Sequence, residues 1–466
     1  TRSLHSAQAR ARAAELRLSL HERSGLPARP ELERHLSSIL QGNARGTAGL
    51  ALLRLDEHFS ILQRALRPSM TEWVLYEIGN RIRAGVGPGA AVYHLRDEEF
   101  AVVVDSVSSN EQLQTLLEGV IRSVRVPVTF PGYQLAVGCN VGVAVCQREK
   151  CEKGRLLRNA DLALNDARQS ASTICFFETS MRSAAVERVQ LQADILSSFQ
   201  HHAENGHGHQ FSMRYQPIIR VDPDPLSGRV LSVGVEALVR WRQADGTVVS
   251  PDRFIPVAEE TGLILPIGNW VLFRVARDIQ AWRADGVHLE SVNVNLSARQ
   301  LLDPQLVDTL RIIGDRFPAT RNRIVLELTE TSIMERPEEA VVRMREIVEA
   351  GYDIAIDDFG TGYSSLNYLR TFPTNCFKID RSFVQNMTQR QQDRAIIRTI
   401  CSLAQDLGYR VIAEGVETEA ELMMLQAEGC DSFQGYLFGR PMIAEDIPGT
   451  IADFDNRAWR EAITLN

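Results

Sequence analysis

From Phe211 onward the sequence alternates between short apolar runs and amphipathic stretches, and this alternation constrains the fold more than any other feature. The amphipathic stretches at 268–285, 337–350 and 392–407 are typical of helices. Eight strands separated by helices over about 240 residues indicate a TIM-type (β/α)8 barrel. The alternative is an open doubly wound sheet, but no GxGxxG follows a first strand. The predicted strands are 211–218, 230–238, 291–296, 323–328, 352–356, 376–379, 409–412 and a short one near Ser432.

The part of the chain before the barrel has a mixed pattern that predicts a separate α/β domain. Strand-like runs at 49–55, 90–95, 100–104 and 135–145 alternate with helical stretches such as 70–84. Between residues 179 and 200, apolar residues such as Val186, Val189 and Ala193 recur at spacings of three and four, which predicts a connecting helix. We therefore expect a linker helix at 1–20, an N-terminal α/β domain at 21–178, an inter-domain helix at 179–202 and the barrel domain at 203–466.

Composition excludes several classes of protein. The 466 residues carry a formal net charge of -8, which disfavours DNA and anionic membrane surfaces as partners. No run of about 18 apolar residues is present, so we expect no membrane span within this segment. The chain begins with Thr1, and residues 1–20 are expected to arrive from an upstream domain, either a sensor or a membrane anchor.

Seven cysteines are spread along the chain without a CxxC pair or neighbouring histidines. This distribution predicts neither a disulfide framework nor a zinc site. A reducing cytoplasm is therefore the expected compartment.

Polar side chains lie at the ends of the predicted barrel strands, where TIM barrels carry their functional residues. Five of them are carboxylates, and burying five carboxylates together without counter-charge is prohibitive. The set therefore implies bound cations. Its members are Glu236, Asn295, Glu327, Asp357, Asp358, Lys378, Glu414 and Gln434.

The oxygen-only ligand set indicates Mg²⁺ or Mn²⁺, because no histidine or cysteine accompanies it. The adjacent Asp357 and Asp358 favour two ions roughly 3.5 to 4 Å apart, one aspartate bridging both and the other binding the second. The alternative is a set of buried salt bridges or helix caps. Cation binding explains the whole set, whereas salt bridges explain its members only one at a time.

The same residues stand in motifs that resemble the EAL family of cyclic di-GMP phosphodiesterases. The resemblance covers about 240 residues and implies hydrolysis of cyclic di-GMP to linear pGpG with two divalent cations, Mg²⁺ or Mn²⁺. A DFG triplet also occurs in kinases, but no glycine-rich loop or HRD accompanies it here. The motifs are YQPI at 215–218, EALVRW at 236–241, FIP at 254–256, NVNLS at 293–297, ELTET at 327–331, DDFGTG at 357–362, FKID at 377–380, EGVE at 414–417 and QGY at 434–436.

The resemblance implies a role for each of these site residues. The implied metal ligands are Glu236, Asn295, Glu327 and Asp357 for the first ion, and Asp357 and Asp358 for the second, with Glu414 nearby. The implied catalytic residues are Asp358, Lys378, which would orient the attacking water or steady the phosphate, and Glu414, the candidate general base.

The resemblance also implies substrate contacts and a regulatory loop. The substrate contacts are Gln216, Leu238, Arg240, Glu417 and Gln434. Of these, Arg240 offers a bidentate fork to a phosphate oxygen, as an acidic protein needs in order to hold an anionic dinucleotide. The loop comprises Phe359, Gly360, Thr361 and Gly362, with Glu330 as the carboxylate that fixes it.

The N-terminal domain resembles GGDEF diguanylate cyclases in the segments GLPAR at 25–29, LRDEEF at 95–100 and NADLAL at 159–164. Arg96 and Asp97 replace the Gly-Gly pair that lets the turn approach a nucleotide, while Glu98, Glu99 and Phe100 complete the motif.

Two further positions depart from the cyclase pattern. The metal-binding aspartate expected near the end of 52–55 is missing, since Arg54 or Leu55 falls there and Asp56 is the nearest acid. GPGA at 87–90 replaces the inhibitory RxxD signature. Cyclase activity is therefore not expected. The domain is interpreted either as a structural dimerisation module or as a sensor that binds GTP without turnover.

Two functions of different classes follow. The first is an active cyclic di-GMP phosphodiesterase with a regulatory degenerate GGDEF domain. The second is a catalytically silent cyclic di-GMP receptor that passes a signal through the inter-domain helix. The full set of metal ligands favours the enzyme, because a receptor can dispense with Glu236, Asp358, Lys378 or Glu414. The family resemblance also implies a homodimer.

Overall fold

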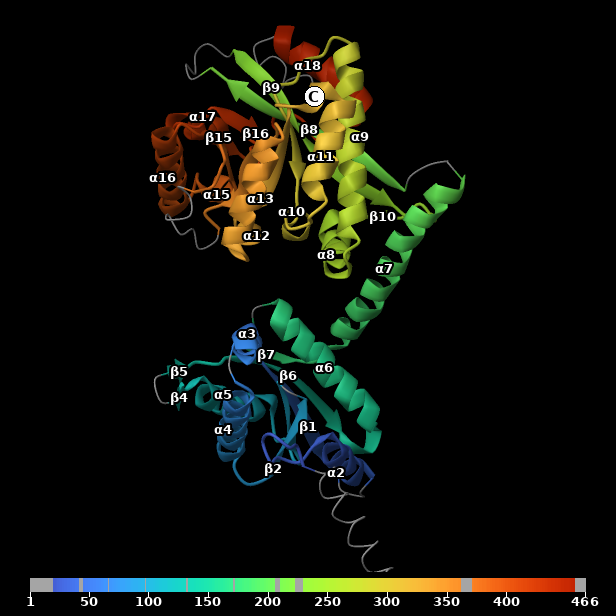
Figure 1. Cartoon of the computed structure of the whole chain (residues 1–466), viewed down its shortest axis with the longest axis vertical. Coiled ribbons are helices and arrows are strands. Elements are labelled where there is room, and N and C mark those ends of the chain that lie inside the picture. The colour runs from blue at the N-terminus through green and yellow to red at the C-terminus, as the bar shows by residue number, and fades with distance from the viewer. Residues whose placement is uncertain are drawn as a thin grey trace, which may run out of the picture. The chain divides into compact units, whose positions relative to one another are not determined.

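The computed structural model describes residues 20–41, 45–65, 67–96, 98–130, 133–170, 172–205, 210–222, 229–361 and 371–456. The chain divides into two compact units, Thr1–Val189 and Gln190–Asn466, and the boundary falls inside the helix α7 (Thr179–Asn205) (Figure 1). Nearly all of the predicted linker helix at 1–20 lies outside the described residues, as do Asp97 and Gly362. The domain limits read from the sequence stay predictions.

The first unit is built on a five-stranded sheet with the strand order β2-β3-β1-β6-β7. The strands pair antiparallel except for β6 and β7, which are parallel. Its elements before α7 are α2 (Arg29–Gln41), β1 (Thr47–Leu55), α3 (Glu57–Ala65), α4 (Pro68–Val86), β2 (Ala90–Arg96), β3 (Glu99–Val104), α5 (Asn110–Arg125), β4 (Val128–Phe130), β5 (Tyr133–Leu135), β6 (Cys139–Gln147), the 3-10 helix η1 (Arg148–Lys150), α6 (Lys153–Gln169) and β7 (Ile174–Phe176).

Both faces of this sheet are covered, so its central strands are apolar on both sides. On one face, α4 and α5 enclose a core that includes Ile78 and Leu117. On the other face, α2 and α6 enclose a core that includes Leu36 and Leu164. The helix α6 approaches β6 so closely that a Cβ at Gly142 would lie 2.0 Å from the backbone nitrogen of Leu164. This position therefore requires glycine.

Two predictions for the first unit were wrong. The strand predicted at 135–145 is interrupted: β5 ends at Leu135, and β6 begins at Cys139 after Gly138 donates its backbone N–H to Asp56. The structure also contains a disulfide between Cys146 and Cys151, which the cysteine spacing did not predict. The cause is local, since the chain turns back through η1 between β6 and α6 and brings two cysteines five positions apart together.

The second unit is a closed barrel, which excludes the open doubly wound sheet. The strand order is β10-β9-β11-β12-β13-β14-β15-β16-β8, and pairing of β8 with β9 closes it (Figure 1). Its elements are β8 (Phe211–Val221), β9 (Val230–Arg242), β10 (Val248–Val249), α8 (Pro251–Thr261), α9 (Ile264–Ala284), β11 (Val292–Asn295), α10 (Ala298–Leu301), α11 (Leu306–Arg316), η2 (Pro318–Thr320), β12 (Ile324–Thr329), α12 (Glu330–Met334), α13 (Pro337–Glu349), β13 (Asp353–Phe359), β14 (Cys376–Ile379), α15 (Arg381–Asn386), α16 (Gln391–Leu407), β15 (Arg410–Ala413), α17 (Glu419–Ala427), β16 (Ser432–Gln434), η3 (Ala444–Asp446) and α18 (Ile447–Asn456).

The barrel departs from the all-parallel TIM arrangement at one strand. β8 runs antiparallel to both of its neighbours, β9 and β16, whereas the strands from β9 through β11 to β16 are parallel. β8 and β9 are connected without an intervening helix, so the second of them must return in the opposite direction.

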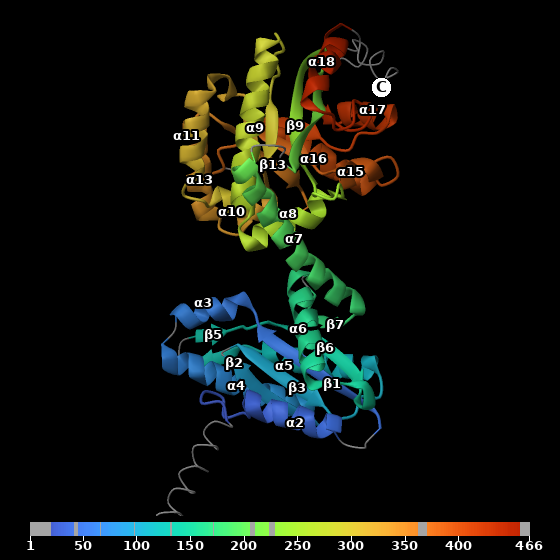
Figure 2. The ribbon, with the colours of Figure 1, turned by 90° about the vertical axis from the view of Figure 1, so that its right-hand side faces the viewer.

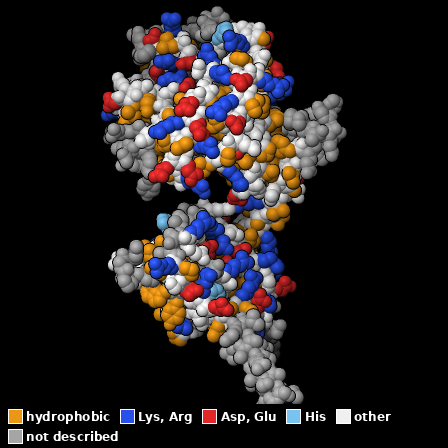
Figure 3. All heavy atoms as spheres, viewed as in Figure 1, with side chains coloured by type: hydrophobic (Ala, Val, Ile, Leu, Met, Phe, Trp, Pro, Cys, Tyr) orange, Lys and Arg blue, Asp and Glu red, His pale blue; other side chains and the backbone are white. Residues whose placement is uncertain are grey.

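Helices surround the barrel strands in both ribbon views (Figure 2). Strands such as β12 are buried along almost their whole length, and this explains their continuous apolar sequence. Side chains of both charge signs are interspersed over the visible face of this unit (Figure 3), so its net negative charge forms no single patch there. Among the described residues, no helix is both long and apolar enough to cross a membrane.

Candidate active site

The ammonium group of Lys378 is the centre of a buried acidic cluster. Lys378 lies in β14 and is 1% exposed. Four carboxylates surround it, three from β9, β12 and β13 and one from the residue that follows β15. The distances from Nζ are 2.5 Å to Glu414 Oε1, 2.8 Å to Glu327 Oε1, 3.4 Å to Asp357 Oδ1 and 3.8 Å to Glu236 Oε2. The predicted gathering of acids at the strand ends is thus present in the structure.

Parallel pairing brings these groups into one layer. Glu236 in β9 is paired with Asn293 in β11, and Asn295 in β11 is paired with Glu327 in β12. Thr329 in β12 is paired with Asp357 in β13. Because the strands share one direction, their carboxyl ends meet at the same edge of the barrel.

A chain of amides holds Glu236 in place. Asn295 Nδ2 donates to Glu236 Oε1 over 2.6 Å, and Gln434 Nε2 donates to Glu236 Oε2 over 2.5 Å. Gln434 Nε2 also lies 3.2 Å from Gln216 Oε1, and Gln216 in turn donates to the Gly439 carbonyl. The structure therefore connects Gln216 and Gln434, predicted as substrate contacts, to a predicted metal ligand.

Asn293 is a site residue that the sequence reasoning did not identify. Its Nδ2 donates to Glu327 Oε1 over 2.8 Å, and both side chains are buried. The signal was available in the alternation N-x-N at 293–295, because residues two apart in a strand point to the same side.

Asp357 and Asp358 are adjacent, and side chains at adjacent positions of a regular strand point in opposite directions. The pairing of β13 with β14 shifts register between Ile356 and Phe359. Within this bulge Asp358 adopts a left-handed backbone conformation with φ of 53°. The bulge therefore breaks the alternation that would point the two aspartates in opposite directions.

Burial and mutual repulsion dominate the electrostatics of the cluster. Burial raises the pKa of Glu414 to about 8, with Asp357 and Glu236 adding to the effect of burial. Burial, together with Asp357, raises the pKa of Asp358 to about 6. Burial also raises the pKa of Glu327 well above its usual range, although Lys378 opposes this shift.

Lys378 and Glu236 are held in their charged forms. Burial acts against the charge of Lys378, yet the surrounding carboxylates, led by Asp357 and Glu236, raise its pKa well above the usual range. Burial likewise acts against ionised Glu236, but Lys378 and the amides of Gln434 and Asn295 together lower its pKa.

Carboxylate and amide oxygens, the donor types at this site, are the ligands that Mg²⁺ and Mn²⁺ prefer. Four carboxylates against one ammonium leave an excess of negative charge in a buried place, and Glu327 Oε2 is a buried oxygen without a hydrogen-bond partner. In the described part of the chain, no three carboxylate, imidazole or thiol side chains converge as metal ligands do. In the acidic cluster, the ammonium of Lys378 lies among the carboxylates.

The loop after β13 is tied to Glu330. Gly360 donates its backbone N–H to Glu330 Oε2 over 3.3 Å, and Thr361 Oγ1 donates to the Asp358 carbonyl over 2.8 Å. Phe359 is buried and stacks on Phe377 with ring centroids 4.4 Å apart. Gly362, the last predicted residue of this loop, lies outside the described residues.

A cavity of about 480 Å³ adjoins the acidic cluster, within the size range of small-ligand sites. Leu238 and Arg240 line it together with Asn295 and Glu327, and apolar side chains form most of the remaining wall. Glu417 is exposed in the loop after β15 and does not line this cavity.

In the first unit, the two described acids of the hairpin between β2 and β3, Glu98 and Glu99, both have partners. Glu99 Oε2 lies 3.0 Å from Arg54 Nη2, and Glu98 Oε2 accepts a hydrogen bond from Ser60. Arg54 thus stands on β1 directly opposite Glu99. Arg96 is exposed at the end of β2. Phe100 is buried in the core.

A closed barrel whose strands surround a lysine with carboxylates defines a TIM-type α/β protein with a buried acidic site. More specifically, the chain belongs to the EAL family: the EAL domain model matches residues 198–441, and the model "Diguanylate cyclase, GGDEF domain" matches residues 22–173. The chain therefore carries GGDEF and EAL domains in tandem.

Curated relatives share this organisation. The bifunctional diguanylate cyclase/cyclic di-GMP phosphodiesterase MucR of Pseudomonas aeruginosa is 33% identical over 456 residues, which cover 97% of this chain and 64% of MucR. The cyclic di-GMP phosphodiesterase NbdA of the same organism is 32% identical over 398 residues, covering 84% of this chain and 49% of NbdA. The chain thus spans about half to two thirds of the length of these relatives.

Solved structures agree with the fold. The structure described as PaMucR phosphodiesterase in complex with c-di-GMP is 39% identical, covers 55% of this chain and 99% of that chain, and has a TM-score of 0.50. A Vibrio cholerae LapD S helix-GGDEF-EAL structure has a TM-score of 0.58 and covers 93% of this chain and 99% of that chain, but at 18% identity it shows the fold alone.

Proposed function

We propose that this chain hydrolyses cyclic di-GMP to linear pGpG with two divalent cations. The observation that carries the proposal is the surplus of buried carboxylates around Lys378 at the strand ends of an EAL barrel. Similarity to phosphodiesterases, and to the structure of the PaMucR phosphodiesterase in complex with c-di-GMP, supports the substrate.

Mg²⁺ or Mn²⁺ would be held by Glu236, Asn295, Glu327, Asp357, Asp358 and Glu414. Bound divalent cations supply Lewis-acid stabilisation of the charge that develops on the phosphodiester oxygens. The amides of Asn293, Asn295 and Gln434 orient the carboxylates by hydrogen bonding. Such supporting contacts keep ligand groups in a productive geometry.

Among the protein's own groups, Lys378 contacts the phosphate or the attacking water, and Glu414 takes up the proton. The ammonium of Lys378, fixed by its carboxylate neighbours, donates to a phosphate oxygen or orients the attacking water. Glu414 accepts the proton of that water. Its carboxylate lies 2.5 Å from the Lys378 ammonium, so the proton acceptor and the ammonium act at the same place.

The cavity beside the cluster would receive the dinucleotide. Its apolar wall, including Leu238, suits a nucleobase, and Arg240 supplies a guanidinium for phosphate. Gln216, Glu417 and Gln434 complete the proposed substrate contacts.

The test is chromatographic detection of pGpG after incubation of the purified chain with cyclic di-GMP and Mg²⁺ or Mn²⁺. Product that disappears with EDTA is expected. Binding of cyclic di-GMP without any product would overturn the proposal in favour of a silent receptor.

Replacement of Glu414 by glutamine is expected to lower kcat by about 10² to 10⁴, because a general base contributes on this scale. The isosteric amide keeps the shape of the site, so the Kd for cyclic di-GMP should change less than threefold. Single-turnover rates and calorimetric binding separate the two quantities. An affinity loss as large as the rate loss would contradict the role of general base.

Replacement of Arg240 by alanine is expected to weaken cyclic di-GMP binding by about tenfold or more, the effect of losing one charge-assisted hydrogen bond. Arg240→Lys keeps the charge but loses the planar fork and should recover only part of the affinity. Arg242→Ala is the matched control, because Arg242 is an exposed arginine in the same strand that does not line the cavity. Unchanged affinity in Arg240→Ala would remove it from the phosphate site.

The GGDEF domain is proposed to be regulatory and not a cyclase. Arg54 neutralises Glu99 where a cation site would need acidic groups, which supports the loss of cyclase chemistry. Adding GTP to the hydrolysis assay distinguishes a GTP sensor, which should alter the rate, from a structural module, which should not. Homodimerisation remains a prediction, and sedimentation of the purified chain tests it.

A further inference from the structure

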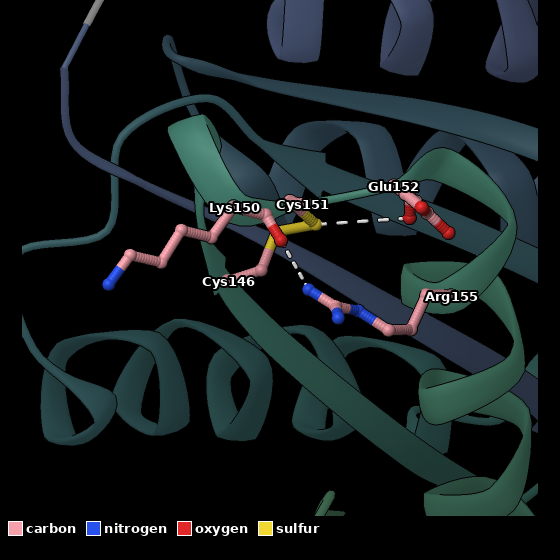
Figure 4. Close-up of a disulfide and its surroundings, with 5 residues drawn as sticks. All are labelled: Cys146, Lys150, Cys151, Glu152 and Arg155. Carbon is pink, nitrogen blue, oxygen red and sulfur yellow. Dashed lines mark hydrogen bonds between the residues drawn. A yellow bond between two sulfur atoms is a disulfide. The ribbon is translucent and has the colours of Figure 1, made fainter.

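The disulfide between Cys146 and Cys151 lies in the connection between β6 and α6. Cys146 is the second-last residue of β6, and Cys151 follows η1 two residues before α6 begins (Figure 4). Their Cα atoms are 5.9 Å apart, inside the range that a disulfide spans. Only four residues separate them, so both sulfurs stay close even when the bond is broken.

Both cysteines are partly exposed, unlike most of the others. Cys139, Cys376, Cys401 and Cys430 are buried, and only Cys175 is similarly accessible among the free cysteines. A small thiol or disulfide in solution can therefore reach Cys146 and Cys151. Accessibility to small reagents is the first requirement for reversible thiol chemistry.

Cys151 stands just before the start of α6. Figure 4 shows the Lys150 side chain extending away from the bridge, and Arg155 donates to the Lys150 carbonyl. α6 has no side-chain cap on its first turn, and Cys151 stands next to its N-cap residue, Glu152. The positive end of a helix stabilises a thiolate, which is the species that exchanges with disulfides.

The disulfide also supports the surface against which α2 packs. Cys146 and Cys151 pack against the core in which Leu32 and Leu36 of α2 meet α6. Lys153 at the start of α6 forms an ion pair with Glu33 of α2 over 3.6 Å. Opening the bridge frees η1 and the start of α6, and so loosens the surface on which α2 rests.

We propose that Cys146 and Cys151 form a reversible dithiol–disulfide site that responds to low-molecular-weight disulfides. The state of this site controls how rigidly η1 and α2 are held. The thiolate of Cys151 attacks one sulfur of the small disulfide and releases one small thiol. Cys146 then displaces the second small thiol and closes the bridge. The protein loses two electrons and two protons, and the small disulfide gains both.

Thiol trapping across a series of reduced-to-oxidised glutathione ratios tests the proposal on the intact chain. Alkylation followed by mass spectrometry should show Cys146 and Cys151 passing together from free to bonded, while Cys175 stays free. Hydrogen exchange should show the amides of η1 and α2 exchanging on the order of tenfold faster in the reduced form, because the bridge no longer restrains the turn. Residues of α5 provide an internal reference.

Single replacements distinguish an exchanging pair from unrelated thiols. Cys146→Ser should trap a glutathione adduct on Cys151, because the second thiol that resolves it is missing. Cys175→Ser is the matched control and should leave the response of the pair unchanged. The proposal is overturned if Cys146 and Cys151 remain free at every ratio, if each accumulates its own adduct in the unmutated chain, or if exchange at α2 is the same in both forms.

Discussion

Replacement of Glu236 by alanine is expected to reduce hydrolysis of cyclic di-GMP by more than about a hundredfold, because the loss of supporting contacts around a metal ligand alone costs 10- to 100-fold. Glu236 receives hydrogen bonds from Asn295 and Gln434 and lies 3.8 Å from Lys378. The change therefore removes a cation ligand and the acceptor for two amides. Initial rates at saturating Mn²⁺ provide the measurement.

Two further variants separate chemistry from folding. Glu236→Gln keeps the volume of the side chain but not its charge, and it should be nearly as inactive as the alanine variant. Glu290→Gln is the matched control, since Glu290 is a partly buried carboxylate paired with Arg410 at the opposite end of the strands. Hydrolysis retained by both Glu236 variants would disprove its assignment as a ligand.

Replacement of Lys378 by methionine is expected to destabilise the barrel by about 3 to 5 kcal/mol in EDTA, as for other buried ion pairs that lose one partner. The four carboxylates around Lys378 would then have no cation. Methionine fills most of the lysine volume, so a cavity contributes little. Urea denaturation at pH 8 measures the loss.

Divalent cations should reverse much of this destabilisation, because an ion that binds only the folded state stabilises it by mass action. With millimolar Mn²⁺ the difference in unfolding free energy between Lys378→Met and the unmutated chain should shrink or disappear. Activity should stay low, since the ammonium that acts on phosphate or water is gone. Equal destabilisation with EDTA and with Mn²⁺ would contradict cation binding by the cluster.

Much of the barrel and its site was predictable from the sequence. Parallel strands covered by helices are apolar along their whole length, so an acid after a run such as Ile-Val-Leu marks the strand end. Strand direction then brings Glu236, Glu327 and Asp357 to one edge. The predicted strands at 323–328 and 376–379 correspond closely to β12 and β14.

Contacts between distant residues were not predictable in this way. The direction of β8 depends on its hairpin with β9, and the central place of Lys378 depends on four strand ends meeting in space. The bulge at Asp358 has no signature in alternation, because a bulge breaks the alternation on which strand prediction depends.

The sequence by itself determined the eight-stranded barrel, the acids at its strand ends and the loss of the Gly-Gly pair in the first domain, because each follows from local pattern and residue type. Only the tertiary structure decided which cation neutralises which acid: Lys378 among the barrel carboxylates, and Arg54 against Glu99. It also decided the pairing of Cys146 with Cys151. The physical reason is that Coulomb attraction and covalent pairing depend on distance in space, which chain spacing does not specify.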